Sequence, residues 1–373
     1  MRRLLAILIL GGLVLAACGD DSSDEAEGTA TTGGTATTDT ATTGGPATTG
    51  GGEPATVTLV AHDSFAVTEE LLADFEDRTG ITIEILTAGD AGQLLSQLIL
   101  TKDDPIGDVV WGIDNTLMSQ ALAEGLFMAY ESPLLEEIAD DLELDPEHRL
   151  LPVDRGDVCL NYDVAYFEEN DVAVPSGLAD LTDPAYEGLL VVQNPATSSP
   201  GLAFLLASVA EFGVDGWQAF WEDLAANDIA VQPGWSEAYY GDFTVAGGGD
   251  RPLVVSYASS PPAEVIFADP PVEEAPTGVI VESCFGQVEF TGILEGTDEP
   301  EAARQVVDFL LSRELQEDIP LNMFVFPANE TADVPPEFVE HTTIPEEPLT
   351  LEADVIAENR EVWIEEWNEI VVG

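Results

Sequence analysis

The chain alternates short runs of β-branched and apolar residues with segments of helical spacing. Strand patterns cover residues 57–60, 81–85 and 108–111, and helical patterns cover residues 68–78 and 91–100 between them. A strand followed by a helix and then by another strand is typical of a parallel sheet with helices on both faces. The sequence therefore predicts an α/β fold.

The same alternation recurs further along the chain. In chain order, the patterns predict a strand at 189–192, helices at 201–212 and 217–225, a strand at 229–231, a helix at 236–246 and a strand at 253–257. Extended apolar runs at 158–162 and 279–290 flank this stretch, and we interpret them as crossovers between two lobes. Amphipathic helices are predicted at 300–317 and 353–371.

The length favours two cores, because about 320 residues follow the N-terminal segments and a single core usually serves fewer. Each lobe is expected to hold a mostly parallel sheet with helices on both faces. We predict lobe one from residues 55–157 and 285–330, lobe two from residues 158–284, and a C-terminal loop and helix at 331–373 that packs back on the body.

The N-terminus has the layout of a secretory signal. Arg2 and Arg3 precede a short apolar run, and Leu15-Ala16-Ala17-Cys18 follows it. Small residues before a cysteine resemble the bacterial lipobox, in which the cysteine becomes the lipidated first residue. We therefore expect a lipoprotein signal peptide at 1–17 and lipidation at Cys18, with an ordinary signal peptide as the alternative.

The segment 18–54 consists mainly of Gly, Thr and Ala after an early acidic cluster. Such a segment lacks the aliphatic bulk that would offset its ordering entropy, so we expect a disordered linker. With the lipid on Cys18, this linker would hold the protein at the outer face of the cytoplasmic membrane through the anchor alone.

Charge limits the choice of partner. The chain has 72 acidic and 10 basic residues, a net charge of −62. Such a surface repels nucleic acid and anionic lipid head groups, so we predict no nucleic-acid partner.

Three cysteines are present. If Cys18 is lipidated, Cys159 and Cys284 remain, and they can form a disulfide in an oxidising compartment. Two buried free thiols are the alternative.

The sequence contains no common catalytic motif. It has only three histidines and lacks H-E-x-x-H, G-x-S-x-G, Walker and G-x-G-x-x-G patterns. We therefore predict a protein that is not an enzyme and that has no cofactor and no metal. A hydrolase with a carboxylate dyad stays open as a minor alternative, because 72 acidic residues make any single pair uninformative.

Polar loops follow several predicted strands. His62-Asp63-Ser64 follows the first strand, and Asp114-Asn115 follows the strand that ends at residue 111. Ligands of open α/β sheets bind at the carboxyl ends of strands, so these loops hold candidate binding residues. Turn and capping chemistry is the alternative.

A third block, Thr197-Ser198-Ser199-Pro200, opens a predicted helix. Ser199 is a suitable N-cap, and Pro200 suits the first helical position. The free N–H groups and the positive dipole of a helix start attract anions, so this block is a candidate phosphate site. A plain capped helix is the alternative.

Aromatic residues accompany two further helix starts. Trp235 and Ser236 begin a block that reaches Tyr239, and Tyr257 ends a predicted strand. An exposed Trp face is the best aromatic surface for a flat cation. Packing as a hydrophobic staple is the alternative for Trp235.

Together these blocks resemble the thiamine-binding proteins of ABC importers. The matching stretches run in the family's order over nearly the whole domain, and the Phe324-Val325-Phe326-Pro327 stretch and the helix with Trp363 and Trp367 also fit. They are Asp63-Ser64-Phe65, Gly112-Ile113-Asp114-Asn115, Thr197-Ser198-Ser199-Pro200-Gly201-Leu202, Gly234-Trp235-Ser236-Glu237-Ala238-Tyr239 and Ser256-Tyr257-Ala258-Ser259-Ser260-Pro261.

The resemblance implies a two-lobed type II periplasmic-binding-protein fold that closes on thiamine, thiamine monophosphate or thiamine diphosphate and delivers it to an ABC permease. It implies that Trp235 and Tyr257 contact the thiamine rings and that Ser198 and Ser199 face the phosphate end. It also implies that Asp63 and Asp114 lie in the cleft. The candidate ligand-binding residues are His62, Asp63, Ser64, Asp114, Asn115, Thr197, Ser198, Ser199, Trp235, Ser236, Tyr239, Tyr257 and Phe324.

At two positions the sequence departs from the family pattern. His62 stands where the family often has Tyr, and Phe324 stands where it often has Trp. A ferric-iron-binding ABC protein of the same fold is the main alternative, because Tyr239-Tyr240 and His62 supply residue types that ligate iron. We expect a monomer in either case.

Overall fold

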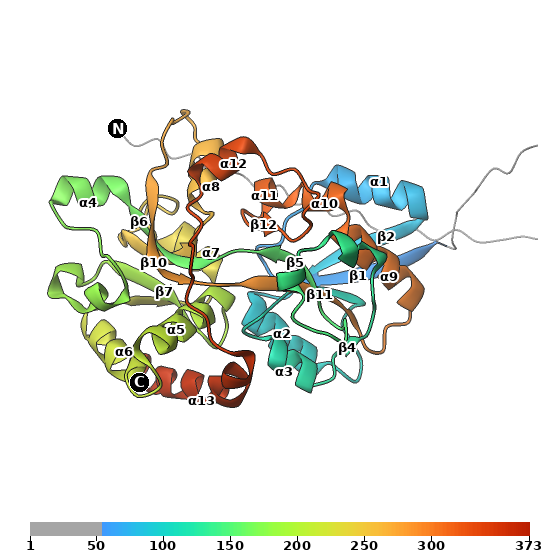
Figure 1. The fold of residues 1–373 in the computed structure, drawn as a ribbon, viewed down its shortest axis with the longest axis horizontal. Coiled ribbons are helices and arrows are strands. Elements are labelled where there is room, and N and C mark those ends of the chain that lie inside the picture. Colours follow the sequence, from blue (N-terminus) through green and yellow to red (C-terminus); the bar gives the residue numbers. More distant parts are fainter. Residues whose placement is uncertain (1–53) are drawn as a thin grey trace, which may run out of the picture. The chain divides into compact units, whose positions relative to one another are not determined.

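The computed structural model describes residues 54–373, so the predicted signal peptide, Cys18 and nearly all of the predicted linker lie outside the described residues. The described part contains two β-sheets with helices packed on them (Figure 1). We call the elements around the first sheet lobe one and those around the second sheet lobe two. The predicted α/β class with two lobes is confirmed.

The sheet of lobe one has seven strands, in the order β12-β5-β11-β3-β1-β2, with β4 paired to β11. β1 pairs in parallel with β2 and β3, whereas β11 runs antiparallel to β3 and β5. The strands are β1 (Ala55–Ala61), β2 (Ile81–Thr87), β3 (Val109–Asp114), β4 (Phe127–Met128), β5 (Leu151–Arg155), β11 (Val288–Leu294) and β12 (Phe326–Pro327).

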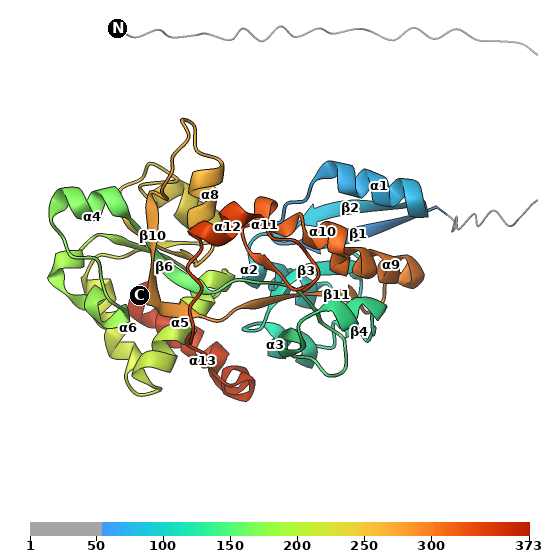
Figure 2. The same cartoon turned by 45° about the horizontal axis from the view of Figure 1, so that its top comes forward.

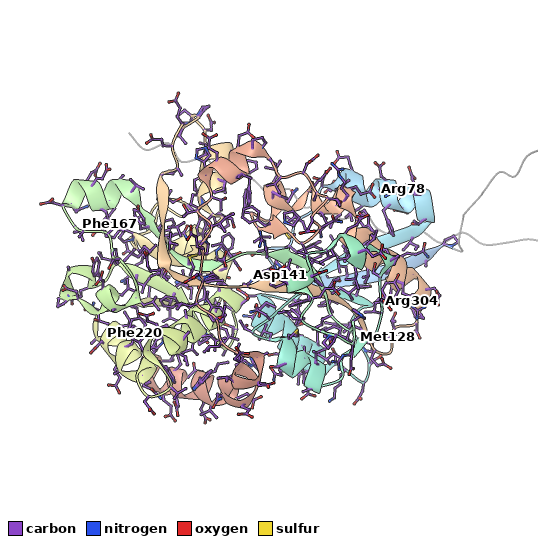
Figure 3. All side chains as sticks on the ribbon, viewed as in Figure 1. Arg78, Met128, Asp141, Phe167, Phe220 and Arg304 are labelled. Atoms are coloured by element: carbon purple, nitrogen blue, oxygen red, sulfur yellow. A yellow bond between two sulfur atoms is a disulfide. The ribbon has the colours of Figure 1, made fainter. Side chains whose placement is uncertain are left out.

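Helices cover both faces of this sheet because its strands are apolar on both sides. Leu59 of β1 belongs to the core that also holds Phe75 and Phe309, whose stacked rings join α1 (Glu69–Thr79) to α9 (Pro300–Leu311). Its neighbour Val60 points to the other face, where α2 (Ala91–Leu100) and α3 (Met118–Ala123) pack. Arg78 on α1 and Arg304 on α9 mark the first of these faces in Figure 3.

The sheet of lobe two has five strands, in the order β10-β6-β9-β7-β8. β7 pairs in parallel with β8 and β9, and β6 runs antiparallel to β9 and β10. The strands are β6 (Val158–Asp163), β7 (Leu190–Gln193), β8 (Ala230–Gln232), β9 (Leu253–Tyr257) and β10 (Thr277–Phe285).

On one face of this sheet lie α5 (Ser199–Phe212) and α6 (Trp217–Ala226). Phe220 of α6 and Phe167 of α4 (Val164–Asn170) are buried in the same core and are labelled in Figure 3. The opposite face carries the short α7 (Trp235–Glu237) and the π-helical turn Ala238–Asp242 that continues it.

Both sheets are mixed, which corrects the expectation of mostly parallel strands. β6 follows β5 with only two residues between them, and β11 follows β10 in the same way. Such short crossovers carry the chain straight from one sheet into the other. The strands on either side of each crossover therefore enter their sheets antiparallel to their neighbours.

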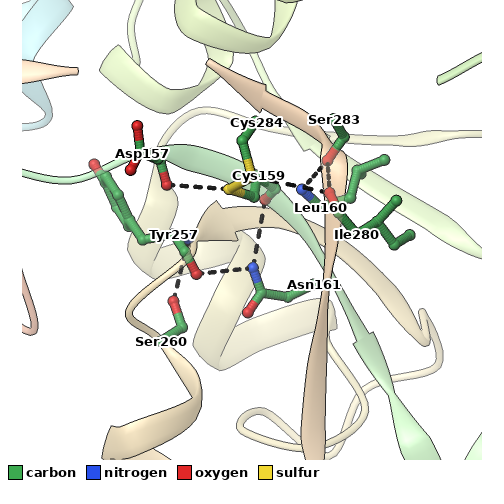
Figure 4. Close-up of a disulfide and its surroundings, with 9 residues drawn as sticks. All are labelled: Asp157, Cys159, Leu160, Asn161, Tyr257, Ser260, Ile280, Ser283 and Cys284. Atoms are coloured by element: carbon green, nitrogen blue, oxygen red, sulfur yellow. Dashed lines mark hydrogen bonds between the residues drawn. A yellow bond between two sulfur atoms is a disulfide. The ribbon is translucent and has the colours of Figure 1, made fainter. Parts of the chain in front are cut away.

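The cysteines of lobe two tie together the two lobe-two strands that adjoin the crossovers. Cys159 on β6 and Cys284 on β10 form a disulfide between residues 125 apart in sequence (Figure 4). Beside it, the Asn161 side-chain amide donates a hydrogen bond to the Tyr257 carbonyl oxygen at 3.0 Å. The disulfide strand β6 is thereby joined to the end of β9, which reaches the site described below.

The C-terminal helix α13 (Ala353–Val371) contacts both lobes (Figure 1, Figure 2). Its Trp367 ring packs edge-on against Trp221 of α6, with ring centroids 5.4 Å apart. Its Arg360 donates a hydrogen bond to the side chain of Gln120 on α3. Before it, α12 (Pro336–His341) packs against α8 (Pro261–Ile266).

Two predicted helices are shorter than their patterns. The helix predicted at 236–246 ends at Asp242, because Phe243 turns extended and bridges to Arg251. The helix predicted at 300–317 breaks at extended Ser312, and α10 (Arg313–Gln316) follows. The remaining helices are α11 (Ile319–Asn322) and the 3-10 helices Pro133–Glu137, Asp140–Leu142, Leu178–Thr182 and Pro184–Tyr186.

Within residues 54–373, no helix combines the length and the apolar character needed to cross a membrane.

Candidate ligand-binding site

A cleft lies between the two lobes, and the space within its outline, open solvent included, is about 600 Å³. Loops after β1 and β2 line it from lobe one, and the starts of α5 and α7 and the end of β9 line it from lobe two. The lining residues are His62, Asp63, Ser64, Asp90, Ala91, Ser199, Pro200, Trp235, Tyr257, Ser260, Glu289, Met323, Phe324 and Val325.

Asp90 joins the two lobes across this cleft. Its Oδ1 accepts hydrogen bonds from the backbone N–H of Ala91 at 2.7 Å and of Ser199 at 3.0 Å, and its Oδ2 accepts one from the backbone N–H of Trp235 at 3.0 Å. The residue is only 7% exposed. Burial raises the pKa of this carboxyl group, although the N–H donors from Ser199 and Trp235 act in the opposite direction. One carboxylate thus accepts hydrogen bonds from the N–H groups at three helix starts, two of which belong to the opposite lobe.

Asp114 lies beneath the cleft and is fully buried. Its Oδ1 accepts hydrogen bonds from the backbone N–H groups of Thr116 at 2.6 Å and Leu117 at 3.1 Å. The hydroxyl of Ser199 donates to its Oδ2 from lobe two. Burial raises the pKa of Asp114, with the Ser199 and Thr116 hydroxyls opposing the rise. Asp114 therefore supports Ser199 from below and does not itself line the cleft.

His62 places both ring nitrogens against lobe one. Its Nε2 lies 3.4 Å from Oε2 of Glu289, and its Nδ1 accepts the backbone N–H of Ser64 at 3.2 Å. Burial lowers the pKa of His62, but the carboxylates of Glu289, Asp90 and Asp63 outweigh it and raise the pKa above its ordinary value.

A second carboxyl group stands behind the His62–Glu289 pair. Burial favours the neutral form of Glu289, but His62 lowers the pKa of this carboxyl group below its ordinary value. Asp154 of β5 is 1% exposed, and burial together with the adjacent Glu289 raises its pKa well above the ordinary value. The pKa values of these two carboxyl groups are thus shifted in opposite directions.

Aromatic residues form the lobe-two side of the cleft. The Trp235 ring stacks on Tyr239 with centroids 4.8 Å apart, and its Nε1 donates to the Ser256 hydroxyl at 2.9 Å. Tyr257 lies 6.5 Å from Trp235, centroid to centroid. These contacts fix the orientation of Trp235 while leaving part of it on the cleft surface.

Tyr239 and Phe324 have different positions around this aromatic group. Tyr239 is buried behind Trp235 and donates its hydroxyl to Glu264 Oε1 at 3.0 Å, so it does not line the cleft. Phe324, from lobe one, lines the cleft with a left-handed backbone (φ 56°) and meets Phe267 of lobe two edge-on at 5.6 Å.

Asn115 lies outside the cleft lining and contacts the crossover into β11. Its side-chain amide donates to the Gly286 carbonyl oxygen at 3.1 Å, and its Oδ1 accepts the Val288 N–H at 3.1 Å. The side chain thus replaces backbone partners where the strand changes lobes.

Three hydroxyl residues predicted for the site also lie beside the lining. Thr197 donates to the Pro233 carbonyl oxygen at 2.5 Å, and Ser198 is buried at the N-cap of α5. The Ser236 and Ser64 hydroxyls lie 3.4 Å apart across the lobes. The cleft thus gathers His62, Asp63, Ser64, Ser199, Trp235, Tyr257 and Phe324 from the predicted set.

Asp90 and Glu289 are the main lining residues that sequence reasoning missed. Asp90 follows the predicted strand at 81–85 and precedes a predicted helix, the same position that singled out the other loops. Glu289 stands near the end of the extended run at 279–290, between Val288 and Phe290. Acidic residues seldom lie in a buried strand without a partner, and that was the available signal.

In the part of the chain that the structure describes, no group of three or more His, Cys, Asp or Glu side chains is arranged to hold a metal ion. His62 faces Glu289, whereas the Tyr239 hydroxyl faces Glu264.

Comparisons with known proteins agree with this architecture. The thiamine-binding periplasmic proteins of Brucella suis and Escherichia coli are 28% and 29% identical to this chain, each over 84% of it and over 91% and 93% of their own lengths. The solved structure of a periplasmic thiamin binding protein superimposes with a TM-score of 0.74 at 26% identity, over 85% of this chain and 96% of that one. Residues 104–359 match the model of the bacterial extracellular solute-binding protein family, and the chain belongs to that family.

Proposed function

We propose that this chain is the solute-binding component of an ABC importer and that its solute is thiamine or a thiamine phosphate. The observation that carries the proposal is the composition of one cleft. The carboxylates of Asp90 and Glu289 line it from lobe one, and the rings of Trp235 and Tyr257 line it from lobe two. The names of the similar proteins support the same solute.

This arrangement suits a flat organic cation. The thiazolium ring of thiamine carries a permanent charge that no proton loss can remove, so its site must stabilise a desolvated cation. A Trp face contributes about 0.5–2 kcal/mol to such contacts. The Asp90 carboxylate lies within hydrogen-bonding distance of the Trp235 backbone, so ring and charge adjoin one another. Asp63 and Glu289 can accept hydrogen bonds from an aminopyrimidine.

A phosphorylated ligand would meet the start of α5. Ser199 lines the cleft there, and its backbone N–H donates a hydrogen bond to Oδ1 of Asp90 at 3.0 Å. Phosphate oxygens are strong acceptors for N–H groups at helix starts. We propose that a ligand phosphate takes the place of the Asp90 carboxylate at this N–H group.

The sequence supports the setting that we propose for this function. The protein would act outside the cytoplasm as a monomer, held by a lipid on Cys18, and would pass its solute to the permease without catalysis, cofactor or metal.

Mass spectrometry of the small molecule released from the purified, denatured protein tests the proposal. We expect thiamine or one of its phosphates in near-stoichiometric amount. A visibly tinted protein that releases ferric iron would favour the iron-binding alternative. Turnover of chromogenic glycosides would favour the hydrolase. Either result would contradict the proposal.

A further inference from the structure

Among the residues that line the cleft, His62 is the sole basic side chain. The two ring nitrogens of His62 have different surroundings. Nδ1 accepts a hydrogen bond from the Ser64 N–H, whereas Nε2 lies 3.4 Å from the Glu289 carboxylate. A neutral ring with its proton on Nε2 keeps Nδ1 as the acceptor for Ser64 and turns an N–H group towards the Glu289 carboxylate.

Gly112 holds the ring in this orientation. A Cβ atom at Gly112 would lie 2.3 Å from Cδ2 of His62, and the backbone there has φ +105°. Only glycine combines that conformation with so close an approach. The ring therefore packs against the backbone of β3 and cannot exchange its nitrogens without moving away from it.

Protonation changes this arrangement in two ways. A proton on Nδ1 turns an acceptor into a donor, so the Ser64 N–H loses its partner. The Ser64 hydroxyl lies 3.4 Å from the Ser236 hydroxyl, so the affected loop is one that touches lobe two. The second change is a positive charge on the surface of the cleft.

We propose that His62 is a specificity-determining residue that makes the preferred ligand charge depend on its protonation. The neutral imidazole favours a cationic solute, and the imidazolium disfavours it relative to an anionic one. This inference rests on the proposed function and assigns the regulation of the same site.

The neighbouring acidic groups decide where the change occurs. Glu289 of β11 faces the His62 ring, and Asp154 of β5 lies behind Glu289. The other titratable groups around the ring are Asp90 at the start of α2, Asp63 next along the chain, buried Asp114 below and Tyr257 across the cleft. Burial opposes protonation of His62, but the neighbouring carboxylates outweigh burial and raise the pKa of His62 above its ordinary value. Thiamine affinity is therefore full at pH values above that raised pKa and falls as the pH drops through it.

Calorimetric titration between about pH 6 and pH 8.5 with thiamine and with thiamine diphosphate tests the inference. For the parent, thiamine affinity should fall roughly tenfold towards the acidic end, the size expected for one added charge within a partly screened cleft. Thiamine diphosphate affinity should fall less or rise. A loss of equal size for both ligands would overturn the inference, because a purely structural role of His62 cannot distinguish their charges.

Two variants locate the effect. His62→Asn keeps an oxygen that can accept the Ser64 N–H, as in an Asx turn, but cannot titrate, so its thiamine affinity should be nearly independent of pH. Asp157→Asn removes a crossover carboxyl group whose pKa burial raises to about 6, and it should keep the pH dependence of the parent. A His62→Asn protein with the parent's dependence would overturn the inference. Absence of thiamine binding at every pH would instead overturn the proposed function.

Discussion

The two sides of the cleft are built from different chemistry. Lobe one contributes an acidic wall, made of Asp63, Asp90 and Glu289, and lobe two contributes an aromatic wall, made of Trp235 and Tyr257. The aromatic wall lacks a charged side chain, and the carboxylates all lie on lobe one, which adds the rings of His62 and Phe324 beside them. A flat cation therefore meets both only when the lobes come together, which makes closure part of recognition.

The walls also differ in how they are held. The Trp235 ring of the aromatic wall is fixed within lobe two, by stacking on Tyr239 and by its hydrogen bond to Ser256. The acidic wall instead has one buried member, Asp90, that is bonded to N–H groups of the other lobe. Changes in the aromatic wall should thus affect ligand contact directly, and changes at Asp90 should affect both ligand and closure.

Removing the ring of the aromatic wall should have the largest effect. We expect Trp235→Ala to weaken thiamine binding by roughly 2–4 kcal/mol, the range of interface hot spots, because stacking area and the cation–π contact are both lost. Calorimetry measures this value. Tyr240→Ala is the matched control, since Tyr240 packs edge-on against Trp235, is 57% exposed and does not line the cleft. Parent-like binding by Trp235→Ala would mean that Trp235 is only a packing residue.

A change in the acidic wall should have an intermediate effect. Asp90→Asn keeps an oxygen and a good N-cap for α2 but removes the charge and one acceptor. We expect thiamine affinity to fall by about 1–2 kcal/mol, as for a lost charge-assisted hydrogen bond. Fluorescence titration of the cleft Trp can follow this loss.

Asp63→Asn controls for a general loss of negative charge. Asp63 lines the same cleft but is exposed to solvent, so its charge is screened and its loss should cost less than about 1 kcal/mol. Equal effects at both positions would show that the position of the charge is unimportant and would remove Asp90 from its proposed role.

The smallest effect on thiamine affinity is expected from a substitution at Ser199, where the two walls meet. Ser199→Ala removes a hydroxyl that is bonded to buried Asp114, and it should change thiamine affinity by less than about 0.5 kcal/mol. Thiamine diphosphate should bind more weakly, by about 1 kcal/mol, if its phosphate lies at the start of α5. Competition of both ligands on one protein sample would measure the difference. An equal loss for both ligands would mark Ser199 as a link between lobes only.

Local patterns predicted the fold well because its strands and helices alternate without long interruptions. The helix predicted at 91–100 coincides with α2, and the strand predicted at 253–257 coincides with β9. The direction of the crossover strands could not be predicted in this way. Whether β6 and β11 run antiparallel to their neighbours depends on which sheet the chain enters, and no local pattern encodes that.

The site was predictable where a residue type and its strand end coincided, as for His62, Trp235 and Tyr257. Asn115 has the same sequence signal but serves the backbone of the crossover. Asp90 has a plain capping signature, and only the approach of lobe two shows its second role. Contacts between residues more than a hundred positions apart decide these cases.

The pairing of an acidic wall with an aromatic wall is tested most directly by exchanging the charge of the ligand at constant shape. Ligand-free protein would be titrated calorimetrically with thiamine and with deazathiamine, an isosteric analogue whose five-membered ring is neutral. We predict one thiamine per chain and binding of the neutral analogue that is weaker by at least roughly 1.5 kcal/mol, about tenfold. Equal affinity for the two compounds, or no binding of thiamine, would contradict the account.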